Sequence, residues 1–203
     1  MQWEIEFLRW IIENLHHPLI DWFMHGLTFL GEVAWVYFLI SFVFLFFKKT
    51  RKTGIACIAA LILIAGFNLF VFKYIFKRIR PFRENEFLYN YVIGRFKNTN
   101  MFNTYPSETS FSFMSGHTLS AFLFATIVSI YHKKSLIPNM IIASLMSFTR
   151  LYYAFHYPTD VIAGVLTGVA FGTLTVFITN KLAPKINTAL INRKKQKIET
   201  VEK

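Results

Sequence analysis

The chain has 203 residues, of which 54% are hydrophobic and 18% aromatic, and its mean hydropathy is +0.41. Soluble domains of this length are rarely so apolar, so the composition excludes an ordinary water-soluble protein and indicates one membrane-embedded domain. The net charge of +11 would suit a nucleic-acid-binding protein, but no nucleic-acid-binding motif accompanies it, and we expect no nucleic-acid partner.

Residues 1–25 are typical of an amphipathic helix. Apolar residues recur at helical spacing and charged residues interrupt them: Ile5, Leu8, Ile11, Ile12 and Leu15, with Glu4, Glu6, Arg9 and Glu13. A helix of this kind lies in the membrane interface more readily than it crosses the bilayer. The alternative is a helix packed in a soluble part, but almost no soluble part exists here. We therefore expect an N-terminal interfacial helix.

Five later stretches are apolar and approach or exceed the length of about 18 residues that a membrane helix needs. They are Leu27–Phe47, Ile55–Phe72, Gly116–Tyr131, Leu136–Phe155 and Val161–Ile178. The sequence thus predicts an all-α fold, a polytopic membrane bundle of about five transmembrane helices over residues 26–180. A basic tail follows over residues 181–203.

Charge is divided unevenly between the two ends of these spans. Loops 48–53 and 132–135 and the tail from Asn180 hold 13 of the 22 Lys and Arg residues but only two of the 11 acidic residues. The other side holds equal numbers of both signs. The positive-inside rule makes the basic side cytoplasmic. We expect a multi-pass protein of the cell membrane with a cytoplasmic C-terminus.

The first of three polar pieces on the opposite, neutral side follows the second span. Lys73 and Arg80 are seven residues apart, so both would face the same way on a helix that Pro81 ends. Two cations on one face at a span end suit an anion. The alternative is that they snorkel to the interface, which is our interpretation of Lys77 and Arg78.

The second piece is Ser115-Gly116-His117, which opens the third span. Serine is a good N-cap, and glycine lets a ligand approach the backbone. Free N–H groups at a helix start form a phosphate cradle, and His117 would lie beside it in the first turn. Taken alone, the tripeptide fits an ordinary capped helix with an interfacial histidine equally well.

The third piece runs from Arg150 through His156 to Asp160. Pro158 suits the first position of the fifth helix, so Asp160 would lie in its first turn. A carboxylate four residues beyond an imidazole can fix the tautomer of that imidazole and stabilise its cation, which makes histidine a directed nucleophile. The alternative for Asp160 is a carboxylate that the helix dipole favours. All three pieces on one membrane face together indicate chemistry on a phosphate.

Lys-x6-Arg-Pro, Ser-Gly-His and Arg-x5-His-x3-Asp resemble the three-part signature of the type-2 phosphatidic acid phosphatases, whose superfamily also contains the vanadium haloperoxidases. The resemblance covers about residues 54–180. Two positions depart from the usual pattern: Met114 replaces the proline before Ser115, and Thr149 replaces the serine before Arg150.

The resemblance implies a role for each signature residue. The phosphate-binding groups would be Lys73, Arg80, Ser115, Gly116 and Arg150. His156 would attack phosphorus and become a phosphohistidine, and Asp160 would orient it. His117 would protonate the leaving oxygen and then help water attack the intermediate. Lysine and arginine supply the positive charge, so the resemblance implies no metal and no other cofactor.

We therefore expect a metal-independent lipid phosphatase whose site faces the outside of the cell. Its substrate would be phosphatidylglycerol phosphate, phosphatidate or undecaprenyl diphosphate. The alternative is a non-catalytic lipid-binding or lipid-moving protein on the same scaffold, toward which Met114 alone leans. A haloperoxidase would need bound vanadate, and its soluble examples fit a membrane chain poorly. The sequence chooses neither the headgroup nor the oligomeric state.

Residues 82–114 are rich in aromatic residues and join the first two motifs. We expect a long interfacial loop that acts as a lid or selects the headgroup, because long loops without structure are usually functional or disordered. An exposed loop without such a role is the alternative.

Overall fold

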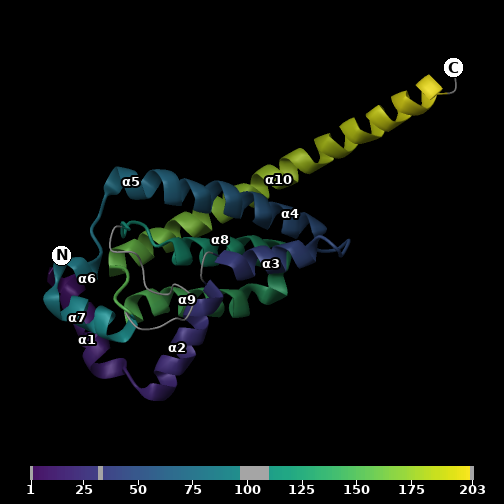
Figure 1. Ribbon diagram of the computed structural model, residues 1–203. Coiled ribbons are helices and arrows are strands. Elements are labelled where there is room, and N and C mark those ends of the chain that lie inside the picture. The colour runs from purple at the N-terminus through teal and green to yellow at the C-terminus, as the bar shows by residue number, and fades with distance from the viewer. Residues whose placement is uncertain (1, 32–33, 97–109, 202–203) are drawn as a thin grey trace.

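The computed structural model describes residues 2–31, 34–96 and 110–201 (Figure 1). Its elements in chain order are α1 (Gln2–Leu15), α2 (Pro18–Gly31), α3 (Trp35–Phe44), α4 (Arg51–Ala60), the π-helical turns Leu61–Ala65 and Asn68–Phe72, α5 (Lys73–Phe76), α6 (Pro81–Glu84), α7 (Glu86–Phe96), α8 (Gly116–Tyr131), the 3-10 turn Lys133–Ser135, α9 (Leu136–Tyr152) and α10 (Pro158–Val201). The described residues form no strand, so the expected all-α class is confirmed.

Helix α8 lies at the centre of the bundle, and every residue from Thr118 to Ser129 is buried. Helix α10 packs closely along it through three glycines spaced four residues apart. A Cβ atom added at Gly168 would lie 2.8 Å from the carbonyl oxygen of Leu119 and 2.8 Å from Cβ of Phe122. Small residues at this spacing let two helix backbones approach closely, as in membrane helix pairs. The other two glycines of the row are Gly164 and Gly172.

The helices match the expected spans in part. Pro158–Leu182 is long and apolar enough to cross a membrane by itself. Helices α2 and α3 together pass the same test, but they meet at an angle of 58°, so the expected span Leu27–Phe47 is not one straight helix. Helix α8 is apolar but shorter. The number of five spans therefore stays a prediction.

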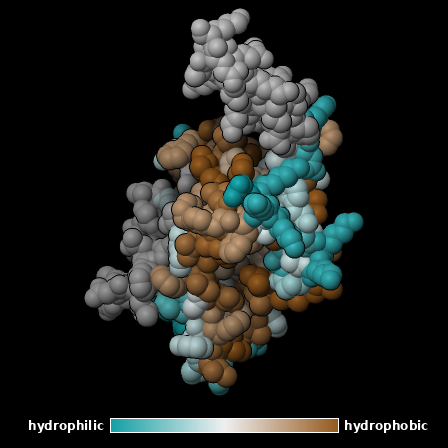
Figure 2. Space-filling view, turned by 90° about the vertical axis from the view of Figure 1, so that its right-hand side faces the viewer, coloured by the Kyte–Doolittle hydropathy of each residue, from teal (hydrophilic) through white to brown (hydrophobic). Residues whose placement is uncertain are grey.

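Apolar side chains cover much of the outer surface. Phe70, Trp22 and Ile137 are 78%, 75% and 71% exposed. In Figure 2 a broad hydrophobic area faces the viewer, with hydrophilic side chains gathered along one edge. Contiguous apolar surface of this extent is unusual on soluble monomers and suits contact with lipid.

The N-terminal segment forms two helices, because α1 ends at Leu15 and Pro18 begins α2. The expected boundary at residue 25 therefore falls inside α2. Helix α1 is amphipathic: it buries Glu4, Leu8 and Ile11, while Trp10 on another face is 52% exposed. Its position in the membrane interface stays a prediction.

The basic loops meet at one end of the bundle. Oγ1 of Thr53 lies 3.0 Å from Nε2 of His132, and the hydroxyl of Tyr131 donates to Oδ1 of Asn180 at 3.2 Å. These contacts join loops 48–53 and 132–135 to the point where the basic tail begins. The N-terminus, α6 and the start of α10 lie at the opposite end (Figure 1).

The expected loop over residues 82–114 is wrong for its first half, which forms the end of α6 and all of α7. Leu88, Val92 and Phe96 recur every four residues and are buried in one apolar cluster with Phe82. This helical spacing explains why the segment folds onto the core. Residues 97–109 of the remaining part lie outside the described residues, and the lid hypothesis stays a prediction.

Candidate active site

The turn after α5 brings Arg80 into the site by a route that the sequence pattern does not predict. Helix α5 ends at Phe76, and Lys77 follows in the left-handed region at φ 44°. Arg80 itself is extended, with φ −74° and ψ 150°, because Pro81 follows it. The expectation that Lys73 and Arg80 share one helix face is therefore wrong: only Lys73 lies on the helix.

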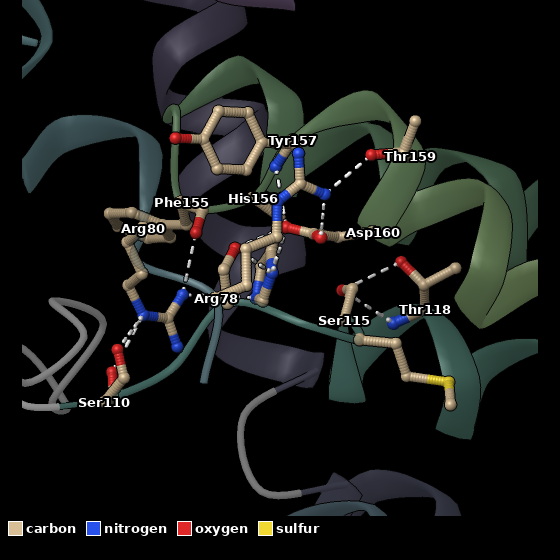
Figure 3. Close-up of polar contacts among 12 residues, drawn as sticks. Arg78, Arg80, Ser110, Ser115, Thr118, Phe155, His156, Tyr157, Thr159 and Asp160 are labelled. Atoms are coloured by element: carbon tan, nitrogen blue, oxygen red, sulfur yellow. Dashed lines mark hydrogen bonds and ion pairs between the residues drawn. The ribbon is translucent and has the colours of Figure 1, made fainter. Parts of the chain in front are cut away.

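Arg80 is 5% exposed, and its guanidinium has partners on two other segments (Figure 3). Its Nη1 donates to the carbonyl oxygen of Phe155 at 2.7 Å and lies 3.2 Å from Nε2 of His156. Its Nε donates to Oγ of Ser110 at 2.8 Å. These hydrogen bonds hold the planar guanidinium of Arg80 next to the imidazole of His156.

His156 meets Asp160 through its other ring nitrogen. Nδ1 lies 3.5 Å from Oδ2 of Asp160 and 3.4 Å from Oγ of Ser112. The Ser112 hydroxyl donates in turn to the same Oδ2. His156 is 3% exposed and Asp160 is fully buried, so this chain of polar groups is shielded from solvent.

Asp160 has further donors on both oxygens. The Tyr157 backbone N–H donates to Oδ2 at 3.0 Å, so Asp160 caps the start of its own helix, where Pro158 is the first residue as expected. Nη1 of Arg78 donates to Oδ1 at 2.6 Å. The carboxylate orientation is thus set by donors on each side.

Ser115 and Gly116 begin α8 as the sequence predicts. The Ser115 side chain accepts from the N–H of Thr118 at 3.4 Å and from its hydroxyl at 3.0 Å. The Ser115 N–H donates to the carbonyl oxygen of Asp160 at 3.3 Å, which joins the second and third motifs. Met114, in place of the usual proline, accepts at its carbonyl oxygen from Nδ2 of Asn68 at 3.4 Å.

Two further signature residues, His117 and Arg150, have buried side-chain atoms. Nε2 of His117 is buried and has no hydrogen-bond partner among the described residues. The guanidinium carbon of Arg150 lies 5.5 Å from the centre of the ring of Phe155, whose carbonyl oxygen accepts from Arg80. Arg150 is 3% exposed and donates to Oγ1 of Thr149 at 3.0 Å and to Oγ1 of Thr28 at 2.7 Å. The hydroxyl of Thr149 therefore orients the guanidinium that follows it.

Burial shifts the protonation of two groups at the site. Burial, then the charge of Arg80, lowers the pKa of His156 to about 3, although Asp160 opposes the shift. Burial, then the charge of Arg80, lowers the pKa of Lys73 to about 8. At neutral pH the imidazole is therefore neutral and Lys73 is mostly cationic.

Sequence reasoning missed several residues of the site. Arg78, read as a snorkelling residue, pairs with Asp160 and also with Glu4, at 2.6 Å and 2.7 Å. A signal for Glu4 existed, since it shares the buried helical stripe of Leu8 and Ile11. Nothing in the sequence marked Ser112.

No group of three or more His, Cys, Asp and Glu side chains that could hold a metal ion occurs among the described residues.

The family model described as the PAP2 superfamily matches residues 54–183. The chain belongs to the PAP2 superfamily. This confirms the resemblance to the type-2 phosphatidic acid phosphatases. The match begins after α1 and α2, so the PAP2 region does not include Glu4 or Thr28, which reach the site from those helices.

Two of the curated proteins to which this PAP2 chain is similar are a lipid A 4'-phosphatase and an undecaprenyl-diphosphatase. The lipid A 4'-phosphatase of Porphyromonas gingivalis is 26% identical over 174 residues, which cover 79% of this chain and 66% of that protein. The undecaprenyl-diphosphatase of Sulfolobus acidocaldarius is 31% identical over 148 residues, which cover 72% and 64%. The matched part is thus less than two thirds of the length of either relative.

A crystal structure has the same fold. It is the transmembrane PAP2 type phosphatidylglycerolphosphate phosphatase of Bacillus subtilis, with a TM-score of 0.63 and 22% identity. The likeness covers 91% of this chain and 86% of that one. It therefore extends over nearly the whole helical arrangement, including helices outside the PAP2 match.

Proposed function

We propose that this protein is a membrane lipid phosphatase that hydrolyses a phosphate monoester or diphosphate of a lipid through a phosphohistidine at His156. The observation that carries the proposal is the setting of this imidazole. Its Nε2 lies 3.2 Å from Nη1 of Arg80, and its Nδ1 lies 3.5 Å from Oδ2 of Asp160. Arginine only donates, so Nε2 is the unprotonated nitrogen and Nδ1 bears the hydrogen.

That tautomer directs the Nε2 lone pair toward the cations. The phosphate oxygens of a substrate draw Arg80 away from Nε2, and Arg80, Arg150 and Lys73 then stabilise the charge of the transition state. Nε2 attacks phosphorus as the bond to the lipid oxygen breaks, and the imidazole becomes cationic. Asp160 stabilises that cation through Nδ1.

His117 completes both halves of the reaction. Its buried Nε2, without a partner among the described residues, is available to the leaving oxygen. In the first step the protonated form of His117, which the negative charge of the bound phosphate favours, donates a proton to this oxygen and releases the lipid alcohol or lipid phosphate. In the second step it accepts a proton from water, which attacks the phosphohistidine and releases inorganic phosphate.

The substrate proposal is broader than the mechanism. The relatives are named for lipid A, undecaprenyl diphosphate and phosphatidylglycerol phosphate, which share a phosphate and differ in the rest. The residues assigned above contact only that shared phosphate. We keep phosphatidylglycerol phosphate, phosphatidate and undecaprenyl diphosphate as candidates and would rank them, with lipid A, by kcat/KM on purified protein.

The decisive test is phosphate release by purified protein in detergent with EDTA present. We expect release by the parent protein and by His17→Gln, a control at an exposed histidine. His156→Gln should be inactive. Equal release by His156→Gln and the parent would reject the mechanism. A parent protein that binds lipid phosphates without hydrolysing any would favour the non-catalytic alternative.

We also propose that the site faces outward and that the C-terminus is cytoplasmic. The support is the gathering of the basic loops at the end of the bundle opposite the site. Single-cysteine variants at Asn90 and at Lys49, made in a Cys57→Ser background, test this with a membrane-impermeant thiol reagent. Intact cells should label position 90 and leave position 49 unlabelled. The reverse pattern would refute the orientation.

A further inference from the structure

We propose that Glu4, on the N-terminal helix α1, is a positioning residue for His156 that acts through Arg78 and Asp160. This inference rests on the proposed phosphatase function. Glu4 would keep the charge around the Asp160 carboxylate negative, so that Asp160 can stabilise the imidazolium that forms when His156 attacks phosphorus.

Glu4 is 2% exposed, although carboxylates are almost never this buried unless they are paired. Its Oε2 accepts from Nη2 of Arg78 at 2.7 Å. Its Oε1 accepts from the hydroxyl of Thr159 at 2.7 Å and from the backbone N–H of Thr159 at 3.2 Å. Glu4 therefore satisfies a free N–H group at the start of α10, the helix that presents Asp160.

Arg78 lies between the two carboxylates. One nitrogen, Nη1, donates to Oδ1 of Asp160 and to the Thr159 hydroxyl, both at 2.6 Å, while Nη2 donates to Glu4. The guanidinium carbon of Arg78 lies 3.9 Å from the centre of the Tyr157 ring, so this ring packs against one face of the guanidinium plane. Arg78 is thus held in one orientation, with Glu4 and Asp160 on opposite arms of its fork (Figure 3 shows the Asp160 and Thr159 arm).

The charges explain why a second carboxylate is present. Arg78 alone would neutralise Asp160, and a neutralised pair stabilises a nearby imidazolium weakly. With Glu4 ionised, the three side chains together carry one negative charge. The net negative charge beside His156 then stabilises the imidazolium, while Arg78 still holds the Asp160 carboxylate in its orientation. Leu8 and Ile11, both fully buried, hold α1 in the position that this arrangement requires.

The first test is Glu4→Gln, which keeps the shape and removes the charge. We expect kcat to fall on the order of tenfold, because about one pKa unit of support for the imidazolium is lost. KM and inhibition by inorganic phosphate should stay within about twofold of the parent, since Lys73, Arg80 and Arg150 are untouched. Glu6→Gln, at an exposed position on the same helix, is the matched control and should behave as the parent.

The double variant Glu4→Gln, Arg78→Gln separates a charge effect from simple loss of structure. It removes one charge of each sign, so the net negative charge on Asp160 returns, and the glutamine amide at position 78 can still donate. We expect its kcat to be at least about threefold above that of Glu4→Gln alone. A double variant as slow as Glu4→Gln, or slower, would overturn the proposal, as would an unchanged kcat in Glu4→Gln. A parent protein that hydrolyses no lipid phosphate would instead reject the proposed function.

Discussion

Nη1 of Arg80 lies 3.2 Å from Nε2 of His156. A cation therefore occupies the position next to Nε2 that the phosphorus atom of a substrate would take. The same nitrogen also donates to the carbonyl oxygen of Phe155, next to the histidine in the chain. In the free protein this arrangement keeps His156 neutral and in one tautomer. A phosphate that takes Arg80 as its own partner would release the lone pair at the moment when phosphorus is within reach.

Replacement of Arg80 by lysine should therefore impair catalysis although it keeps the charge. A lysine cannot hold Ser110, the Phe155 carbonyl oxygen and a phosphate at once. We expect kcat/KM to fall by a factor on the order of 10² to 10³, comparable with the loss of one transition-state donor. Arg83→Lys, at an exposed position three residues later, is the control. Parent-like kcat/KM in Arg80→Lys would show that charge alone suffices.

Lys73 should set the alkaline limb of the pH profile. Burial and the charge of Arg80 lower its pKa to about 8, so above this pH a phosphate-binding cation is lost and kcat/KM falls. Lys73→Arg should move this limb to higher pH. Because the folded protein loses this proton before the unfolded chain does, the contribution of Lys73 to stability rises with pH above 8. Thermal unfolding followed across the same range would therefore show that falling activity does not reflect unfolding. A limb that stays near pH 8 in Lys73→Arg would assign it to another group.

Ser112→Ala should slow the chemical step with little effect on substrate binding. The hydroxyl lies 3.4 Å from Nδ1 of His156 and donates to Asp160, so its loss leaves the imidazole less well oriented. We expect kcat to fall about tenfold with KM nearly constant. Ser144→Ala, at an exposed serine of α9, is the control. A change confined to KM would mean that Ser112 contacts the substrate instead.

Gly168→Ala should weaken the bundle itself. The added Cβ would lie 2.8 Å from backbone and side-chain atoms of α8, and neither helix can move away without disturbing the site that both carry. We expect a loss of about 1 to 3 kcal/mol of stability, visible as a lower thermal midpoint in detergent. Gly66→Ala is the control, because nothing lies within 4 Å of a Cβ there. An unchanged midpoint in Gly168→Ala would mean that the α8–α10 contact is looser than it is in the structure.

Local rules carried much of the sequence prediction. The N-cap preference of serine placed the start of α8 at Gly116, and the preference of proline for the first helical position placed Asp160 in the first turn of α10. These are effects between near neighbours, which a single sequence displays. The all-α class followed in the same direct way from the length of the apolar stretches.

Sequence prediction failed where an unusual backbone conformation or a contact between residues far apart in the sequence determines the structure. Lys77 adopts the left-handed conformation, which moves Arg80 off the helix. Glycine is the residue that usually indicates this conformation, and none is present at this turn. The Glu4–Arg78 pair joins residues 74 positions apart, and amphipathic spacing alone does not identify such a partner. The length and aromatic content of residues 82–114 predict an interfacial loop, whereas the apolar spacing of Leu88, Val92 and Phe96 indicates the helix that forms. The α2–α3 bend lies within the first of the five predicted spans, and their number stays a prediction.

The bond from the Ser115 N–H to the Asp160 carbonyl oxygen uses main-chain atoms only. Substituting the side chain of either residue leaves both bonding partners in place. A variant such as Asp160→Asn, which we expect to be inactive, should therefore keep the site assembled. Such a variant is the natural starting material for trapping a bound lipid for crystallography or electron cryo-microscopy.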